Sequence, residues 1–241
     1  MNNKNTFKIE ILSFFLFYLN IVTSQTFEKL VYTENLKGGY QGFSTFLDYN
    51  NDGLLDIFVT GLDFGSNGDF KHAIFYKNNG DKTFTESPIK NIPRTVYGDY
   101  SWGDFDNNGT LDLIYSGTTS GFAENNITKI YKNINNGCEF VEVPTSIPAI
   151  IYGNIEWIDV NNDGLLDVFY QGLNKKEEYD SGIFKNNGDE TFTKIENTSF
   201  YIINGDRANA QFNRAKWADL DGDGLKDVIT ASSTKTEREF A

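Results

Sequence analysis

Short apolar segments of strand length alternate with polar turns along most of this chain. Four of them follow an acidic loop: "LDIFVTG" from Leu55, "LDLIYSG" from Leu111, "LDVFYQG" from Leu166 and "KDVITAS" from Lys226. Three others lead into an Asn-Gly turn and a second segment that opens with Phe, as in "FYKNNGDKTF" (75–84). Short runs bounded by Gly and Asn are typical of β-strands, and no segment shows sustained helical periodicity. The pattern therefore predicts antiparallel strands joined by tight turns.

These segments belong to an internal repeat. Its four copies, "DYNNDGLLDIFVTG", "DFDNNGTLDLIYSG", "DVNNDGLLDVFYQG" and "DLDGDGLKDVITAS", occupy residues 48–61, 104–117, 159–172 and 219–232. The copies start 56, 55 and 60 residues apart, and each interval has room for four short strands. Radial repetition of four-stranded antiparallel sheets gives a β-propeller. We predict an all-β propeller of such blades, about four of them present and the ring incomplete.

The chain resembles the FG-GAP/VCBS repeat family, whose best-known members form the calcium-binding β-propeller of integrin α-chains. The resemblance rests on four copies of D-x-[DN]-x-[DN]-G-x-x-D and on three Asn-Gly turns that are each followed by Phe. It covers nearly all of the chain after the first residues. The resemblance implies a secreted propeller with metal loops between the first two strands of each blade.

The first nine residues of each copy, here named loops 1 to 4, have the donors of a calcium site. Side-chain oxygens at positions 1, 3, 5 and 9 can converge on one hard cation, together with a backbone carbonyl at position 7. An EF-hand would need a bidentate Glu at position 12, where this chain has Val59, Tyr115, Tyr170 and Thr230. We predict about four Ca²⁺ sites. The predicted ligands are Asp48, Asn50, Asp52, Leu54 and Asp56; Asp104, Asp106, Asn108, Thr110 and Asp112; Asp159, Asn161, Asp163, Leu165 and Asp167; and Asp219, Asp221, Asp223, Leu225 and Asp227.

The alternative is that each loop is only a polar hairpin turn. Asp and Asn are common in turns because their side chains bond to the neighbouring backbone. A turn does not require an Asp at position 9, however, and all four copies have one. This makes the metal interpretation the stronger of the two.

The beginning of the chain has the pattern of a secretory signal peptide. Lys4 and Lys8 precede an apolar stretch of 12 residues (11–22), and small residues follow this stretch. We predict a signal peptide at 1–24 and the propeller at 25–241, with no transmembrane segment in the mature chain. An uncleaved anchor is the alternative, although a membrane span needs ~20 apolar residues. Copy four lacks the Asn-Gly turn, so we expect truncation at the C-terminus.

Composition narrows the range of functions. A net charge of −13 argues against nucleic-acid binding, which needs a basic surface. Cys138 is the only cysteine and cannot form an internal disulfide, and His72 has no recognisable catalytic set around it in the sequence. We expect Trp102, Trp157 and Trp217 to pack between blades, and sugar stacking is the alternative for them.

The sequence thus predicts a secreted or cell-surface calcium-binding propeller that acts in adhesion or ligand binding and is not itself an enzyme. Its partner would be an extracellular protein or a polysaccharide. The alternative is the propeller domain of a secreted polysaccharide lyase or glycoside hydrolase. Arg207 and Arg214, which lie in the longest connection between repeats, would be the residues to test for that activity.

Overall fold

The structure is a computed structural model. It describes residues 36–37, 40, 42–65, 68–89, 91–137, 139–196, 198 and 214–231. The chain divides into two compact units, 1–31 and 32–241, and all described residues belong to the second. The signal peptide expected at 1–24, together with Cys138 and Arg207, lies outside the described residues, and only the backbone of Arg214 is described.

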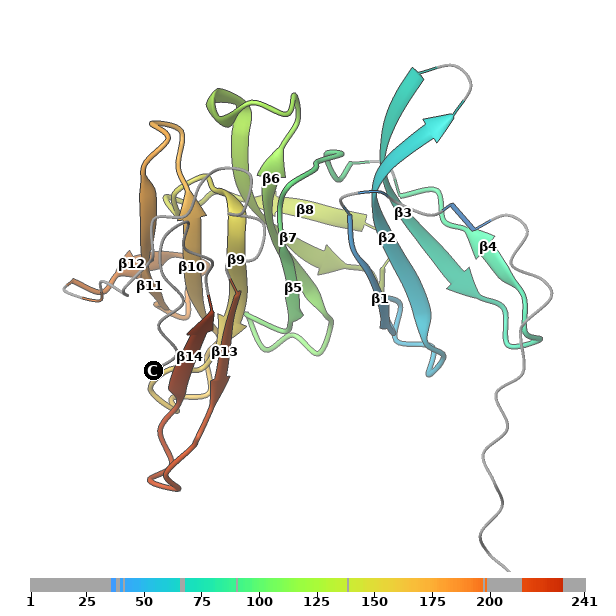
Figure 1. Cartoon of the computed structure of the whole chain (residues 1–241). Coiled ribbons are helices and arrows are strands. Elements are labelled where there is room, and N and C mark those ends of the chain that lie inside the picture. Colours follow the sequence, from blue (N-terminus) through green and yellow to red (C-terminus); the bar gives the residue numbers. More distant parts are fainter. Residues whose placement is uncertain are drawn as a thin grey trace, which may run out of the picture. The chain divides into compact units, whose positions relative to one another are not determined.

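Antiparallel β-sheets make up nearly all of the regular structure, apart from one short 3-10 turn, η1 (Ala123–Asn125) (Figure 1). We call the sheets blades 1 to 4 in chain order. Blade 1 consists of β1 (Ser44–Leu47), β2 (Asp56–Gly65), β3 (Gly68–Asn78) and β4 (Phe84–Glu86). Blade 2 consists of β5 (Tyr100–Gly103), β6 (Asp112–Thr118), β7 (Asn126–Ile134) and β8 (Glu139–Val143). Blade 3 consists of β9 (Ile151–Ile158), β10 (Asp167–Leu173), β11 (Tyr179–Asn186) and β12 (Phe192–Lys194). The described part of blade 4 consists of β13 (Arg214–Ala218) and β14 (Asp227–Ala231).

This architecture confirms the predicted fold class. Within each sheet the strands lie in chain order and neighbours run antiparallel, as in a propeller blade. No sheet closes on itself among the described residues. In that part of the chain, no helix is long and apolar enough to span a membrane.

The second strand of each blade begins at the ninth residue of an acidic loop. β2, β6, β10 and β14 start at Asp56, Asp112, Asp167 and Asp227. β6 and β10 are buried along their whole length, because each has a strand on either side and a neighbouring blade against each face. Such strands read as continuous apolar runs, which is the pattern seen in the sequence.

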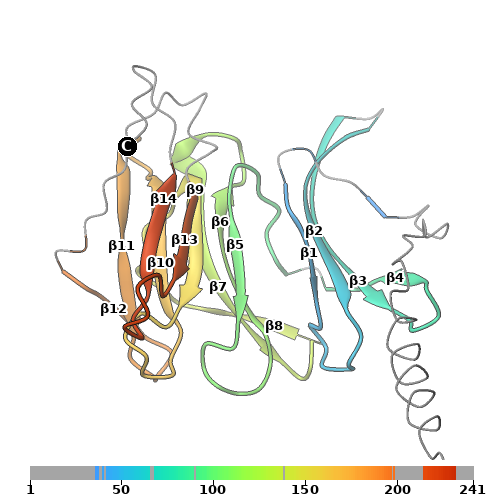
Figure 2. The same cartoon turned by 60° about the horizontal axis from the view of Figure 1, so that its bottom comes forward.

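Aromatic side chains join consecutive blades, which follow one another in chain order in two views (Figures 1 and 2). Trp102 packs edge-on against Phe58 of blade 1, with ring centroids 5.3 Å apart. Trp157 stacks on Phe105 at 5.3 Å, and Trp217 meets Phe169 at 5.2 Å. The prediction that the tryptophans pack between blades is therefore confirmed.

Candidate metal centre

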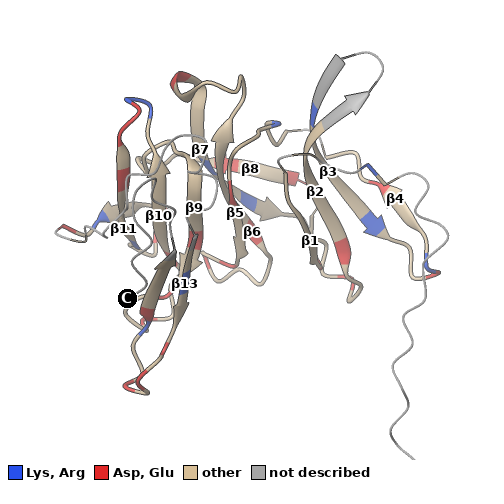
Figure 3. Cartoon of the chain, in the orientation of Figure 1, with Lys and Arg blue, Asp and Glu red and all other residues tan. Residues whose placement is uncertain are grey.

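The four acidic loops join the first and second strands of their blades. Figure 3 shows acidic residues at these loops, at the lower ends of the blades in this view. Each loop has the same place in its blade, because it always lies between the first and the second strand. The structure therefore puts all of the predicted ligand residues into four equivalent loops.

The first aspartate of each loop organises the turn around its own carboxylate. Asp48 accepts hydrogen bonds from the backbone N–H of Asp52 (3.0 Å) and of Gly53 (2.8 Å). Asp104 and Asp159 accept the equivalent pairs, and Asp219 also accepts two backbone N–H bonds. Gly53 has a φ of +84°, a conformation that glycine adopts without steric cost. The carboxylate at position 1 is thus fixed inside the loop.

The side chains at positions 3 and 5 form short turns that orient their outer oxygens. Oδ1 of Asn50 accepts the N–H of Asp52 at 3.0 Å, and Oδ1 of Asp52 accepts the N–H of Leu54 at 3.0 Å. The same two bonds occur in loop 3, at 3.0 Å each, for Asn161 and Asp163. One oxygen of each carboxylate at position 5 is therefore committed to the backbone, and Oδ2 is left for another partner.

The aspartate at position 9 is buried in loops 1 to 3. Asp56, Asp112 and Asp167 have no exposed surface, and Oδ1 of each accepts a backbone N–H from the end of the third strand, at 2.7 or 2.8 Å. In loops 2 and 3 Oδ2 also accepts the N–H of the residue at position 2. In loop 1, Oδ2 of Asp56 is buried and lacks a hydrogen bond of normal geometry. A buried carboxylate oxygen without a partner is costly unless a cation compensates it.

Burial also changes the protonation of these groups. Burial raises the pKa of Asp112 to about 7, and the negative charges of Asp106 and Asp104 contribute to the rise. Burial likewise raises the pKa values of Asp56 and Asp167. A cation among the carboxylates would favour their charged forms and oppose this effect.

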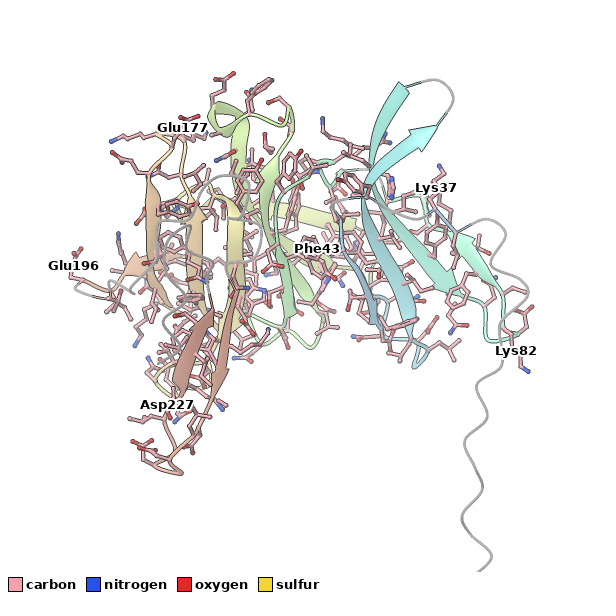
Figure 4. The ribbon with its side chains drawn as sticks, in the orientation of Figure 1. Lys37, Phe43, Lys82, Glu177, Glu196 and Asp227 are labelled. Atoms are coloured by element: carbon pink, nitrogen blue, oxygen red, sulfur yellow. The ribbon has the colours of Figure 1, made fainter. Side chains whose placement is uncertain are left out.

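Two of the loops bring three carboxylates close together. Oxygens of Asp104, Asp106 and Asp112 lie within 4.8 Å of one another, and so do oxygens of Asp219, Asp221 and Asp227. Figure 4 labels Asp227 near the base of the fourth loop, where β14 begins. Loops 1 and 3 also have three aspartates each, but Asn50 and Asn161 take the third position, and no such group of three carboxylates forms there among the described residues.

The donor set fits a calcium ion. All side-chain donors are carboxylate or amide oxygens, which hard divalent cations prefer, and the partnerless Oδ2 of Asp56 lies within the set. The Thr110 hydroxyl donates to the carbonyl oxygen of Asn133 at 2.9 Å, so this side chain ties the loop to the third strand. Ligation by the backbone carbonyls of Leu54, Thr110, Leu165 and Leu225 stays a prediction.

Sequence reasoning missed an asparagine that joins each loop to its blade. Asn133 is fully buried at the end of β7, and its Nδ2 donates to the carbonyl oxygens of Leu111 (3.1 Å) and of Tyr49 in the preceding loop (2.7 Å). Asn186 repeats both bonds with Leu166 and Phe105, one blade further on. The Lys-Asn pair that recurs before each Asn-Gly turn could have indicated this asparagine. A tight turn alone, however, already accounts for an asparagine at this place.

A second set of asparagines connects neighbouring loops directly. Nδ2 of Asn51, at position 4 of loop 1, donates to the carbonyl oxygen of Gly109 in loop 2 at 2.8 Å. Asn107 donates in the same way to Gly164 at 3.2 Å, and Asn162 donates to Gly224. Asn51 has a φ of 55°, which Asn tolerates better than most residues. Consecutive loops are thus linked through their glycines.

A separate hollow of about 320 Å³ lies along the first strands of blades 2 to 4. In this hollow, Asp99 accepts a hydrogen bond from Nδ2 of Asn154 at 2.6 Å. Nζ of Lys216 forms an ion pair with Oε1 of Glu156 at 3.3 Å. Phe43 and Tyr100 supply aromatic surface to the same hollow. Aromatic and charged groups side by side suit a polar ligand with apolar faces.

Comparison with known proteins supports the sequence pattern. No curated protein matches the chain. The family model for the FG-GAP-like repeat matches residues 48–115 and 159–230, which together make up more than half of the sequence. Both matches begin at the first aspartate of an acidic loop. The chain therefore belongs to the FG-GAP-like repeat family.

Proposed function

We propose that this chain is an exported calcium-binding β-propeller protein that binds an extracellular protein or a polysaccharide. The observation that carries the calcium part is the convergence of three carboxylates in loops 2 and 4, each with its ninth-position aspartate at the start of a strand. Like charges this close oppose folding unless a cation neutralises them. Membership of the FG-GAP-like repeat family supports the same proposal.

Calcium would supply positive charge at each loop, and the chain's own residues would hold the loop in shape around it. The first aspartate keeps the turn closed, and in loops 1 to 3 the buried ninth aspartate anchors the loop to the third strand. Because Asn51, Asn107 and Asn162 link each loop to the next, an ordered loop also supports its neighbour. Calcium would thereby stiffen a scaffold that presents a binding surface.

The hollow on the first strands is the surface that we propose for ligand binding. Its aromatic and charged groups suit a polysaccharide or a polar protein segment. In the alternative, the chain would be the propeller domain of a polysaccharide lyase or hydrolase. Asp99 is engaged with Asn154 and the backbone of Ile155, and Oε1 of Glu156 is engaged with Lys216, whereas Oε2 of Glu156 is buried without a hydrogen-bond partner. These contacts favour binding over acid–base catalysis at this place.

The number of bound ions tests the calcium proposal. We expect the full-length chain, dialysed against millimolar CaCl₂, to carry about four calcium ions by elemental analysis, since extracellular sites bind at ~10⁻⁴–10⁻³ M. The variant Asp221→Asn should lose about one ion, because it removes a carboxylate from loop 4. As a matched control, Asp189→Asn removes the same charge from an exposed turn outside the loops and should change nothing. Fewer than one ion per wild-type chain would contradict the proposal.

Export is tested by the mature N-terminus. A tagged full-length chain, expressed in a cell with a general secretory pathway, is expected outside the cytoplasm with Gln25 as its first residue by mass spectrometry. The variant Leu16→Arg should stay inside and uncleaved, because a charge disrupts the apolar stretch that the pathway recognises. An uncleaved wild-type chain that begins at Met1 would speak against a signal peptide.

A further inference from the structure

A lysine ammonium group contacts each of the first three acidic loops. Nζ of Lys77 lies 3.1 Å from Oδ2 of Asp52, and Nζ of Lys185 lies 3.2 Å from Oδ2 of Asp163. In loop 2, Nζ of Lys132 lies 2.6 Å from Oδ2 of Asp106. All three lysines come from the third strand of their blade, directly before the asparagine that anchors the loop. The contact is thus a property of the repeat.

The lysine takes the oxygen that a metal would need. In Asp52 and in Asp163, Oδ1 accepts a backbone N–H from two residues further on, so Oδ2 is the oxygen that faces a cation. Oδ2 of Asp163 also accepts a hydrogen bond from Nδ2 of Asn161 at 3.1 Å. Oδ2 is also the atom that the ammonium group contacts. An ammonium group and a Ca²⁺ ion on one carboxylate oxygen would repel each other as like charges.

Loop 2 indicates that the lysine follows the negative charge rather than a fixed position. Position 5 of this loop is Asn108, which has no charge, and here the lysine pairs with position 3 instead. Lys132 also lies 2.6 Å from Oε1 of Glu190, which belongs to the Asn-Gly turn of blade 3. It therefore has a second anionic partner available when the loop carboxylate is taken by another cation.

We propose that Lys77, Lys132 and Lys185 are built-in competitors of calcium, which neutralise loops 1 to 3 when no ion is bound and lower the calcium affinity of these loops. This inference rests on the proposed calcium function. In the calcium-free blade, the ammonium group reduces repulsion among the loop carboxylates and keeps the loop folded. When calcium binds, the lysine gives up or shares its oxygen, and the cost of that exchange reduces the affinity.

The proposal also ranks the loops. Loop 4 holds four aspartates, whereas loops 1 to 3 hold three each, so it should bind calcium more tightly than loops 1 and 3. Lys132 should compete most strongly, since its partner Asp106 is only 12% exposed and water screens this pair less than the other two.

Calorimetric titration of the full-length chain with CaCl₂ tests the proposal. Lys77→Met and Lys185→Met each remove the charge but keep an apolar stem, and each should tighten one site by about three- to tenfold, as expected for loss of a partly exposed competing charge. Lys77→Arg keeps the charge and should stay within about twofold of the wild type. Lys129→Met is the matched control, because it breaks an exposed ion pair with Glu142 away from the loops and makes the same change in net charge.

A second readout needs no calcium. In EDTA, Lys77→Met and Lys185→Met should unfold at a lower temperature than Lys129→Met, because they leave the loop charges uncompensated. Unchanged or weaker calcium binding in both variants, with binding intact in the wild type, would overturn the competitor role alone. Absence of calcium binding in the wild type would overturn the proposed function and this inference together.

Discussion

Millimolar calcium is expected to raise the unfolding midpoint of the full-length chain by about 10–20 °C relative to the same protein in EDTA. A ligand at ten times its Kd stabilises the folded state by about 1.4 kcal/mol per site, and four sites contribute about 6 kcal/mol. For a domain of this size, each kcal/mol shifts the midpoint by about 2–4 °C. The measurement is circular dichroism of the β-sheet signal during heating.

Two variants separate loop binding from a general effect of the ion. Asp221→Asn should lose roughly a quarter of the shift, because loop 4 is one of four sites and its three converging carboxylates become two. Asp189→Asn, outside the loops, should keep the whole shift. If the protein is folded and has the same unfolding midpoint in calcium and in EDTA, the acidic loops are polar turns and not calcium sites.

Asn133→Ala is expected to destabilise the chain by about 3–5 kcal/mol, the largest effect of a single substitution that we anticipate. The side chain is fully buried and makes three hydrogen bonds, to the carbonyl oxygens of Tyr49 and Leu111 and from the N–H of Gly137. Removing it leaves buried backbone groups unsatisfied, at about 1–3 kcal/mol each. The midpoint of urea unfolding in calcium measures the loss.

The matched control is Asn78→Ala. Asn78 has the same position in blade 1, and its side chain forms hydrogen bonds with the backbone of Leu55 and of Gly80. Among the described residues, it makes no hydrogen bond to a preceding loop. It should cost only about 1–2 kcal/mol. Equal losses for the two variants would mean that the bond from Asn133 to Tyr49 does not hold blades 1 and 2 together.

Local patterns predicted the strands and loops correctly because their causes are local. The apolar run behind each acidic loop is the central strand of a blade, and the ninth loop residue begins it. The tryptophan before loops 2, 3 and 4 was also interpreted correctly, because its fixed place in the repeat indicated packing between blades.

The contacts that could not be predicted involve partners far apart in the sequence. Asn133 and Tyr49 are 84 positions apart, and the bond between them depends on how two blades pack. The contacts of the Lys-Asn pair could not be predicted either, because polar residues before an Asn-Gly turn are expected without any distant partner. Nothing in the sequence indicated that Asp112 is buried, because an aspartate beside a polar loop is normally expected to contact water.

The joints between blades explain how such repeats can diverge without coming apart. Asn133 and Asn186 bond to main-chain carbonyl groups of the preceding loop, which every amino acid possesses. The hydrogen bond itself therefore does not depend on the side chain at the acceptor position, which is Tyr49 in one loop and Phe105 in the next. Duplicating a blade would copy donor and acceptor together, so the new joint would form without a compensating mutation.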